Sequence, residues 1–434
     1  MLTAFIRAFR TPDLRKKLLF TVFIIAVFRL GAALPTPGVS ERAIQLCLGT
    51  AKNNSVLQLV NLFSGGALQK LTVFALGIMP YITASIILQL LAVVIPRLEA
   101  LRKEGQTGQA KITQYTRYLT IGLAILQSTG IIALARSGSL IPGCSANLIP
   151  NPSVFTITTM VIIMTAGTAV IMWLGELLTD RGVGNGMSVL IFTQIIAVIP
   201  GQLQLIYNER GAFVFGMVLI MGVAIIAFVA LMEQAQRRIP IQYAKRMVGR
   251  RMYGGTSTYI PLKVNQAGVI PVIFASSLLY IPELAAQLFG RNATSGWANW
   301  VNQNLTLTNR PELAYAVAFF LLILFFTYFY VSITFNPTEV ADGMKKSGGF
   351  IPGIRPGGPT AGYLSYVLSR LTAAGSLYLG LVALIPVIAI GLLGATAQFP
   401  LGGTSILIAV GVGLDTVKQI ESQLQQRNYE GFLR

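Results

Sequence analysis

The sequence predicts an all-α membrane protein with ten transmembrane helices. Of its 434 residues, 54% are hydrophobic and only 11% are charged, and apolar stretches recur along almost the whole chain. An average soluble domain has roughly 25% charged residues, so this chain has too few polar side chains to cover soluble domains. Lys and Arg outnumber Asp and Glu by 33 to 15, which is typical of a polytopic membrane protein with basic loops.

Each transmembrane helix is predicted from the length of an apolar window. A hydrocarbon core about 30 Å thick requires roughly 20 apolar residues in a helix, because unpaired backbone groups are not tolerated in lipid. Ten windows meet this requirement: residues 18–34, 74–95, 115–135, 153–177, 184–201, 212–232, 268–289, 313–334, 372–395 and 403–420. The first window follows five basic residues, as a signal peptide does, but Arg29 interrupts it and Pro35-Thr36-Pro37-Gly38 follows, so we expect an uncleaved span.

The distribution of basic residues predicts the orientation. If the windows alternate in direction, 25 of the 33 Lys and Arg residues lie on the side of the two termini and seven lie on the other side. Arg29 lies within a span. Because basic loops stay on the cytoplasmic side, we expect both termini in the cytoplasm.

Several kinds of chemistry are excluded by missing residues. The chain has no His, and its two cysteines, Cys47 and Cys144, are far apart and have no CxxC spacing. His-based triads and Cys-rich metal sites are therefore excluded, and no phosphate-binding loop motif is present. We expect no catalytic residue, no metal and no cofactor. Cys47 and Cys144 fall in external loops, where they are either two incidental thiols or a disulfide in an oxidising compartment.

Two segments of the chain resemble each other. Residues 77–88, in the second window, and residues 268–279, in the seventh, share six of twelve positions, including the Gly and the Pro. Five spans separate the two copies, so they cross the membrane in opposite directions. Matched helix breaks in two inverted halves indicate a transport path near the membrane centre. The alternative is chance similarity between sequences rich in Ile, Leu and Ala.

A short segment between the first two windows is half apolar and interrupted by glycine. Residues 61–70, Asn-Leu-Phe-Ser-Gly-Gly-Ala-Leu-Gln-Lys, are too few to span the membrane. The segment is either an interfacial helix of the external loop or a re-entrant segment that enters a cavity of the helix bundle.

Motifs spread over essentially the whole chain resemble those of the SecY-type protein-conducting channels. They are Arg29-Leu30-Gly31, Pro35–Gly38, Asn61–Leu68, Phe74–Ile82, Lys111–Tyr118, Trp173–Glu176, Arg181–Gly186, Pro261–Asn265 and Pro352–Gly357. Several blocks in the same order are far more specific than one motif. The resemblance implies two inverted five-helix halves, residues 1–205 and 206–434, with a short re-entrant plug helix at about 57–72.

The resemblance also implies the residues of the channel. A narrow ring of apolar side chains maps onto Ile78, Ile82, Met187, Ile191, Ile273 and Ile408. The plug maps onto Asn61, Leu62, Phe63, Ser64, Gly65, Gly66, Ala67 and Leu68. The polar residues of a lateral gate, between spans two and three and spans seven and eight, map onto Thr83, Gln127 and Asn265. Without the resemblance, the six ring positions would be taken as ordinary apolar positions.

An apolar ring suits this function for a physical reason. A translocating chain needs a pore wide enough for side chains, yet ions must not leak through it. A dry aliphatic constriction opposes ions by dewetting, whereas charged or hydrogen-bonding rings select ions. Met187 departs from an all-Ile ring, which we expect to affect the tightness of the seal more than the mechanism.

Two basic loops are predicted on the cytoplasmic side, at about 233–267 and 335–371. The first has seven basic residues and one acid, Glu233, which is more charge than orientation requires. It is either a strong topogenic signal or a docking surface for anionic lipid, nucleic acid or an acidic protein. The resemblance favours docking of a ribosome or a SecA-type motor ATPase, through Arg238, Lys245, Arg246, Arg250, Arg251, Lys345, Lys346, Arg355 and Tyr429.

The predicted function is therefore a channel of the Sec pathway in the bacterial cytoplasmic (inner) membrane. The resemblance implies translocation of unfolded secretory polypeptides, recognised by their signal peptides, and lateral release of transmembrane segments into the bilayer. It also implies SecE-type and SecG-type small membrane subunits. The alternative is a secondary transporter of a small solute, which would generally need polar or charged groups at the membrane centre. An intramembrane protease is discarded, because His is absent and 411–415 does not match the aspartyl motif GxGD.

Overall fold

A computed structural model of the chain describes residues 11–44, 65–68, 70–136, 148–243, 246–248, 251–253, 257–289, 296–297, 300–301, 313–393 and 403–430. The long helices in these ranges are α2 (Pro12–Ala33), α5 (Met79–Val94), α7 (Gln106–Arg136), α8 (Val154–Arg181), α9 (Gly186–Gln234), α10 (Ile270–Phe289), α12 (Leu313–Thr334), α14 (Gly358–Leu393) and α15 (Gly403–Glu430). The ten predicted windows all fall on these helices, because α9 contains both the fifth and the sixth.

By length and mean hydropathy alone, six helices of the described ranges can cross a membrane, or seven if the bent pair α5–α6 is one span. Helix α2 is left out of this count because of its charged residues, among them Lys16, Lys17 and Arg29, and α15 continues into the polar segment after residue 420. Large apolar side chains are exposed on the outer faces of the helices, among them Val154 (83% exposed), Phe213 (81%) and Ile220 (74%). Such surfaces suit a lipid environment better than water.

Two breaks in the helices follow from Gly and Pro. Helix α9 bends at Gly211, whose φ of 81° is outside the helical region, so the fifth and sixth spans are joined with almost no loop. The predicted boundary at residue 205 therefore lies inside α9, just before the bend, and stays a prediction. Helix α6 (Pro96–Lys103) meets α5 at an angle of 100°, because Ile95, before Pro96, is extended.

The predicted repeat has the same local structure in both copies. Gly77 has a φ of 57° and Gly268 a φ of 62°, a left-handed conformation that glycine adopts at low cost. A helix begins two residues later in each case, and Pro80 and Pro271 occupy the second helical position, where a missing N–H is harmless. The predicted start of the second span at residue 74 is too early, because residues 70–78 form turns and a bridge to the chain after α2.

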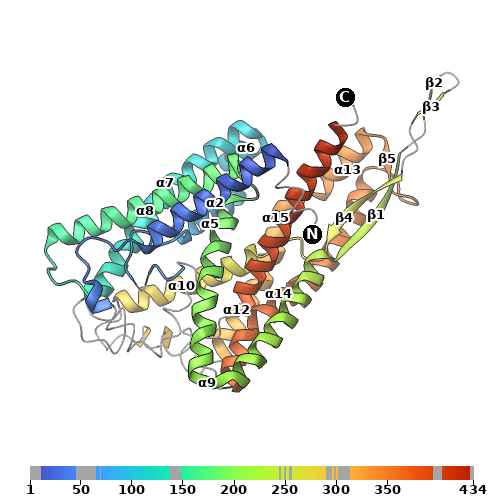
Figure 1. The fold of residues 1–434 in the computed structure, drawn as a ribbon. Coiled ribbons are helices and arrows are strands. Elements are labelled where there is room, and N and C mark those ends of the chain that lie inside the picture. The colour runs from blue at the N-terminus through green and yellow to red at the C-terminus, as the bar shows by residue number, and fades with distance from the viewer. Residues whose placement is uncertain are drawn as a thin grey trace.

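The helices pack in two groups with α10 between them (Figure 1). In the first group, α5 contacts α7, α7 contacts α8, and α8 contacts α2 and α9. In the second group, α12 contacts α10 and α14, while α15 contacts α14 and α9. Helix α10 also contacts α5 and α7, so it joins the groups.

A small sheet lies beyond the ends of α9 and α10 and projects from the helices (Figure 1). Strands β1 (Gln236–Tyr243) and β4 (Ser257–Lys263) pair antiparallel, with Gln236 opposite Lys263, and β2 (Arg246–Val248) pairs with β3 (Arg251–Tyr253) at the tip. Strand β5 (Gly349–Phe350) follows α13 (Pro337–Lys346) and joins the other edge of β1. The two basic loops, predicted as separate segments, therefore share one sheet.

Candidate functional site

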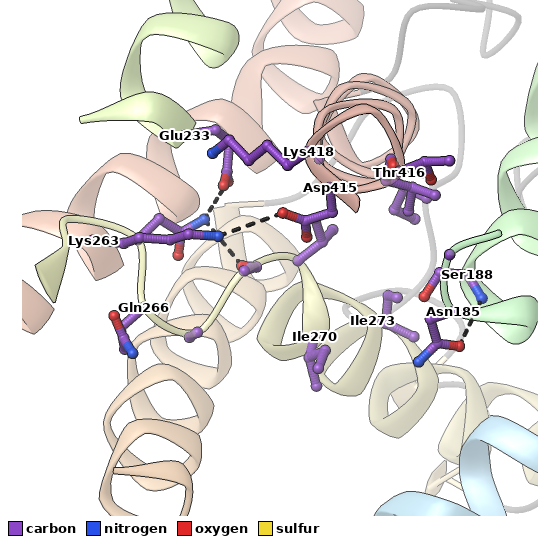
Figure 2. Close-up of a pocket in the computed structure, with 18 of the residues that line it drawn as sticks. Asn185, Ser188, Glu233, Lys263, Gln266, Ile270, Ile273, Asp415, Thr416 and Lys418 are labelled. Carbon is purple, nitrogen blue, oxygen red and sulfur yellow. Dashed lines mark hydrogen bonds and ion pairs between the residues drawn. The ribbon is translucent and has the colours of Figure 1, made fainter. Parts of the chain in front are cut away.

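A pocket of about 520 Å³ lies where α9, α10, α12 and α15 meet the end of β4. Its walls are polar in part, with Asn185 and Ser188 from the start of α9 facing residues of α15 and of the segment between β4 and α10 (Figure 2). Three predicted ring residues, Ile191, Ile273 and Ile408, line it. The pocket therefore combines polar walls with aliphatic side chains from three helices.

All six predicted ring residues belong to one apolar cluster. Ile78, Ile191 and Ile408 are buried in it, and Ile82, Met187 and Ile273 are partly buried against it. They come from the starts of α5 and α9, from α10 and from α15, which lie far apart in the sequence. This cluster also includes residues of α2, α8, α12 and α14, so it is a core shared by most of the helices. The structure brings Ile191, Ile273 and Ile408 together at the pocket, and the ring of six stays a prediction.

Local structure explains how the start of α9 places Met187. The side-chain oxygen of Asn185 accepts hydrogen bonds from the N–H groups of Met187 (3.1 Å) and Ser188 (3.4 Å), which caps the helix. Met187 packs closely on α8, because a Cβ added to Gly175 would lie 2.4 Å from its sulfur. Any larger residue at position 175 would displace Met187.

One wall of the pocket is a network of charged and amide groups (Figure 2). The Asn265 amide nitrogen donates to a carboxylate oxygen of Glu233, at the end of α9, and to the carbonyl of Gly268 at 3.1 Å. The Lys263 ammonium lies 3.4 Å from a carboxylate oxygen of Asp415 on α15. Asn265 and Glu233 are only 2% and 8% exposed. This network connects the base of the sheet with α9, α10 and α15.

The predicted plug is described only in part. Asn61, Leu62, Phe63 and Ser64 lie outside the described residues, whereas Gly65, Gly66, Ala67 and Leu68 lie inside them. Ala67 and Leu68 are buried, with 1% and 2% exposure. The Arg29 guanidinium of α2 donates to the Gly65 carbonyl at 3.5 Å. The described part, Gly65–Leu68, is thus packed against the helices, which favours a re-entrant segment over an interfacial helix.

The predicted lateral-gate residues do not bond to one another in the described structure. Thr83 donates to Met79 of its own helix at 2.9 Å, Gln127 is half-buried on α7, and Asn265 bonds to Glu233 and Gly268. The helices that would flank such a gate are nevertheless adjacent, since α10 contacts both α5 and α7. The segment after α5 also reaches the other flank, because Arg102 donates to the Ile333 carbonyl of α12 at 2.8 Å.

The predicted docking residues gather around the sheet, as far as they are described. The Arg238 guanidinium lies 4.8 Å above the Tyr259 ring, and Lys345, Lys346 and Arg355 are exposed. Arg246 and Arg251 lie on β2 and β3 and Tyr429 on α15, but their side chains are not described, and Lys245 and Arg250 lie outside the described residues. An apolar cluster beneath the sheet includes Ile239, Leu262, Met344 and Leu364, so it joins both basic loops to α14.

Sequence reasoning missed one strong polar contact between helices. Arg117 of α7 donates two hydrogen bonds, of 2.9 and 2.7 Å, to the carboxylate of Glu176 on α8. Both residues belong to motifs noted in the sequence, but nothing in those motifs indicates that they pair. Such a bidentate contact fixes the two helices relative to each other.

The fold defines an α-helical, multi-pass membrane protein. A sequence model of the SecY family matches residues 72–417. Protein translocase subunit SecY of Streptomyces scabiei is 66% identical over 441 residues, a match that covers 100% of both chains. The chain belongs to the SecY family.

Solved structures agree with this fold. The structure described as that of a protein conducting channel has a TM-score of 0.65 at 18% identity and covers 94% of this chain and 92% of that one. Sec61 in the canine ribosome-channel complex from the endoplasmic reticulum has a TM-score of 0.61 at 18% identity, with the same coverage. At these identities the likeness establishes the fold alone. Membership of the SecY family leaves no support for the alternative of a small-solute transporter.

Proposed function

We propose that this chain forms the pore through which unfolded secretory polypeptides cross the bacterial cytoplasmic membrane, and from which transmembrane segments leave sideways into lipid. The observation that carries this proposal is that Ile191, Ile273 and Ile408, from three helices, line one pocket whose other walls are partly polar. A polypeptide entering the pocket first meets polar side chains that can form hydrogen bonds with it. It then meets an apolar constriction that binds no particular side chain. Such a constriction closes around any sequence and opposes ions by dewetting.

The plug and the gate complete the channel. Residues 61–68 close the resting pore, and the contact of Arg29 with Gly65 supports a seat for them inside the bundle. The side exit lies between α5 and α7 on one flank and α10 and α12 on the other, which the contacts of α10 with α5 and α7 support. The two halves, residues 1–205 and 206–434, separate there.

The energy comes from partners, since the chain itself is a channel and not an enzyme. The sheet and the start of α14 dock a ribosome or a SecA-type motor ATPase, through basic side chains such as Arg238 and Arg355. The solved ribosome-channel complex supports a ribosome as one partner. SecE-type and SecG-type small membrane subunits complete the complex, and both termini lie in the cytoplasm with the sheet.

Reconstitution tests this function directly. The chain is placed in vesicles with SecE-type and SecG-type subunits. A SecA-type motor, ATP and an unfolded secretory precursor are then added to these vesicles. We expect the precursor to become protected from external protease, and no protection without the motor. Uptake of small solutes by the same vesicles, without protein translocation, would support a transporter instead.

Crosslinking tests the assignment of the pore. A photo-crosslinking residue at Ile82 or Ile273 is expected to capture a stalled translocating chain. The control is the same residue at Phe23 of α2, which is 62% exposed on the outer face and is expected to capture none. Equal capture at all three positions, or none at Ile82 and Ile273, would contradict the assignment.

A further inference from the structure

A polar contact joins the two flanks of the proposed side exit at the end of the helices that faces the sheet. The Nη2 atom of Arg102, near the end of α6, donates to the carbonyl of Ile333, near the end of α12, at 2.8 Å. The two residues are 231 positions apart in the sequence. Helix α6 connects α5 with α7 on the first flank, whereas α12 belongs to the second flank, so this hydrogen bond crosses the exit.

The local sequence explains why the Ile333 carbonyl accepts from another segment. Ile333 is the second-last residue of α12, and the last carbonyls of a helix have no partner within it. Four positions further on, where a continued helix would supply an N–H donor, the chain has Pro337, the first residue of α13. Asn336 is extended before this proline and accepts from the N–H of Thr338 at 3.2 Å, which caps α13. The end of α12 therefore offers an acceptor, and its helix dipole favours a cation there.

The bend between α5 and α6 brings the donor to this acceptor. Because Ile95 is extended before Pro96, α6 leaves α5 at an angle of 100° and does not continue along its axis. Arg102 lies six residues beyond Pro96, which is about 9 Å along α6 at a rise of 1.5 Å per residue. No residue of α6 is buried, so its polar contacts matter for where its end lies.

Neighbouring charges favour the same arrangement. The pKa of Lys103 is raised, first by its hydrogen bond and ion pair with Glu99 of α6, at 2.7 Å, and further by the charge of Glu339 in the first turn of α13. The end of α6 thus presents two cations, Arg102 and Lys103, to the end of α12 and the start of α13. The contact between Arg102 and Ile333 is exposed to solvent, so it stabilises the arrangement only modestly.

We propose that Arg102 is a positioning residue that holds the two flanks of the side exit together until a transmembrane segment separates them. The inference rests on the side exit proposed above. The hydrogen bond exists only while α6 and α12 are adjacent, so it stabilises the closed exit. When α12 moves away from α5 and α7, water replaces the guanidinium at the Ile333 carbonyl, and the cost is small because the contact is already exposed. The exit therefore stays closed at rest and opens without a large barrier.

A pair of spin labels measures this balance in vesicles that contain the resting complex with its partner subunits, without ribosome or motor. Cys47 and Cys144 are replaced by Ser, and labels are attached at Val94, at the end of α5, and at Tyr328 on α12, which are 76% and 44% exposed. Electron paramagnetic resonance gives the distances between the labels. We expect Arg102→Met to increase the population at longer distances about twofold to fivefold, the range for an exposed hydrogen bond to a charged group.

Matched variants separate the loss of this contact from a general loss of charge. Arg102→Lys keeps the charge and N–H donors, and we expect its distances to lie between those of the wild type and Arg102→Met. Arg97→Met removes another exposed cation of α6, and we expect it to leave the distances unchanged. If Arg102→Met does not assemble with its partner subunits, Arg102→Gln replaces it and the same increase is expected.

A crosslink separates failure of this inference from failure of the side exit. Arg102→Cys and Ile333→Cys are joined by a flexible thiol crosslinker that a reductant cleaves. We expect the crosslink to abolish integration of a transmembrane segment into lipid, measured by alkaline extraction, and reduction to restore it. If the crosslinked complex integrates the segment normally, the flanks do not separate here, and the side exit and this inference both fail. If the crosslink blocks integration but Arg102→Met does not increase the longer distances, or Arg97→Met increases them equally, the side exit stands and the role of Arg102 is wrong.

Discussion

The contact between Glu233 and Asn265 gives the sharpest quantitative prediction, because both side chains are buried and bond directly to each other. The Asn265 amide donates to the Glu233 carboxylate and to the Gly268 carbonyl. Replacing Asn265 with Ala removes both hydrogen bonds and leaves a carboxylate that is 8% exposed without its amide donor. The segment that starts α10 also loses its tie to the end of α9.

The magnitude follows from these contacts. A hydrogen bond to a charged group contributes about 1.5–3 kcal/mol and one to a backbone carbonyl about 1 kcal/mol. The Asn265 oxygen has no partner among the described residues, so its removal recovers about 1 kcal/mol. We therefore expect Asn265→Ala to lower the free energy of unfolding by about 1.5–3 kcal/mol.

A double-mutant cycle isolates the pair from the rest of the network. The free energy of unfolding of the purified complex in mixed micelles is measured by denaturant titration for Glu233→Ala, Asn265→Ala and the double variant. We expect a coupling energy of about 2 kcal/mol, and about half of that when Glu233→Gln, which keeps an acceptor, replaces Glu233→Ala. Additivity within about 0.5 kcal/mol would refute the reasoning.

Three further substitutions test other contacts. Arg117→Met removes both hydrogen bonds to Glu176. Because the Arg117 side chain is 41% exposed, we expect the free energy of unfolding, measured by the same titration, to fall by only about 1–2 kcal/mol. Gly167→Ala places a Cβ 2.1 Å from the Val73 carbonyl oxygen, so we expect a cost of about 2–3 kcal/mol and a lower thermal midpoint. Arg355→Glu is expected to leave folding unchanged and to weaken binding of ribosomes and motor about tenfold or more, measured by co-sedimentation.

Each of these substitutions has a control elsewhere in the chain. Lys111→Met breaks an exposed ion pair of 3.8 Å, which contributes at most about 0.5 kcal/mol. Gly122→Ala, on α7, meets no atom within 4 Å and is expected to be neutral or stabilising. Arg370→Glu changes the charge as Arg355→Glu does, at a residue of the same basic loop that is not among the predicted docking residues. Equal effects in a variant and its control would contradict the corresponding prediction.

The spans and the repeat are predictable from the sequence because their causes are local. Whether an apolar window can span the membrane depends only on its own length and composition. The repeat is equally local, because a glycine followed three residues later by a proline imposes the same helix start at Gly77 and at Gly268. The start of α5 was predicted wrongly because hydropathy is also a local signal. Residues 74–78 are as apolar as the helix that follows, and hydropathy does not distinguish a buried turn from a helix.

The sheet and the polar contacts depend on residues far apart in the chain, so no local pattern specifies them. Strand β1 alternates in burial, but its second partner is β5, more than 100 residues away in the sequence. The contact of Arg29 with Gly65 crosses 36 residues and that of Arg117 with Glu176 crosses 59. The sequence indicated that Arg29 lies within a span and that Arg117 belongs to a motif, but only the packed helices decide which acceptor each arginine meets.

A short chain of contacts joins the sheet, the proposed docking surface, to the pocket. Strand β4 ends at Lys263, which reaches Asp415, and Asp415 lies two helical turns along α15 from Ile408. Two residues beyond Lys263, Asn265 holds the turn that starts α10, the helix of Ile273. Both α10 and α15 line the pocket with predicted ring residues, so we expect a force on the sheet to reach them. Proximity alone does not establish coupling. If the Glu233–Asn265 cycle shows coupling while Asn265→Ala leaves the motor-driven translocation rate unchanged, the contact is structural and the route does not transmit docking.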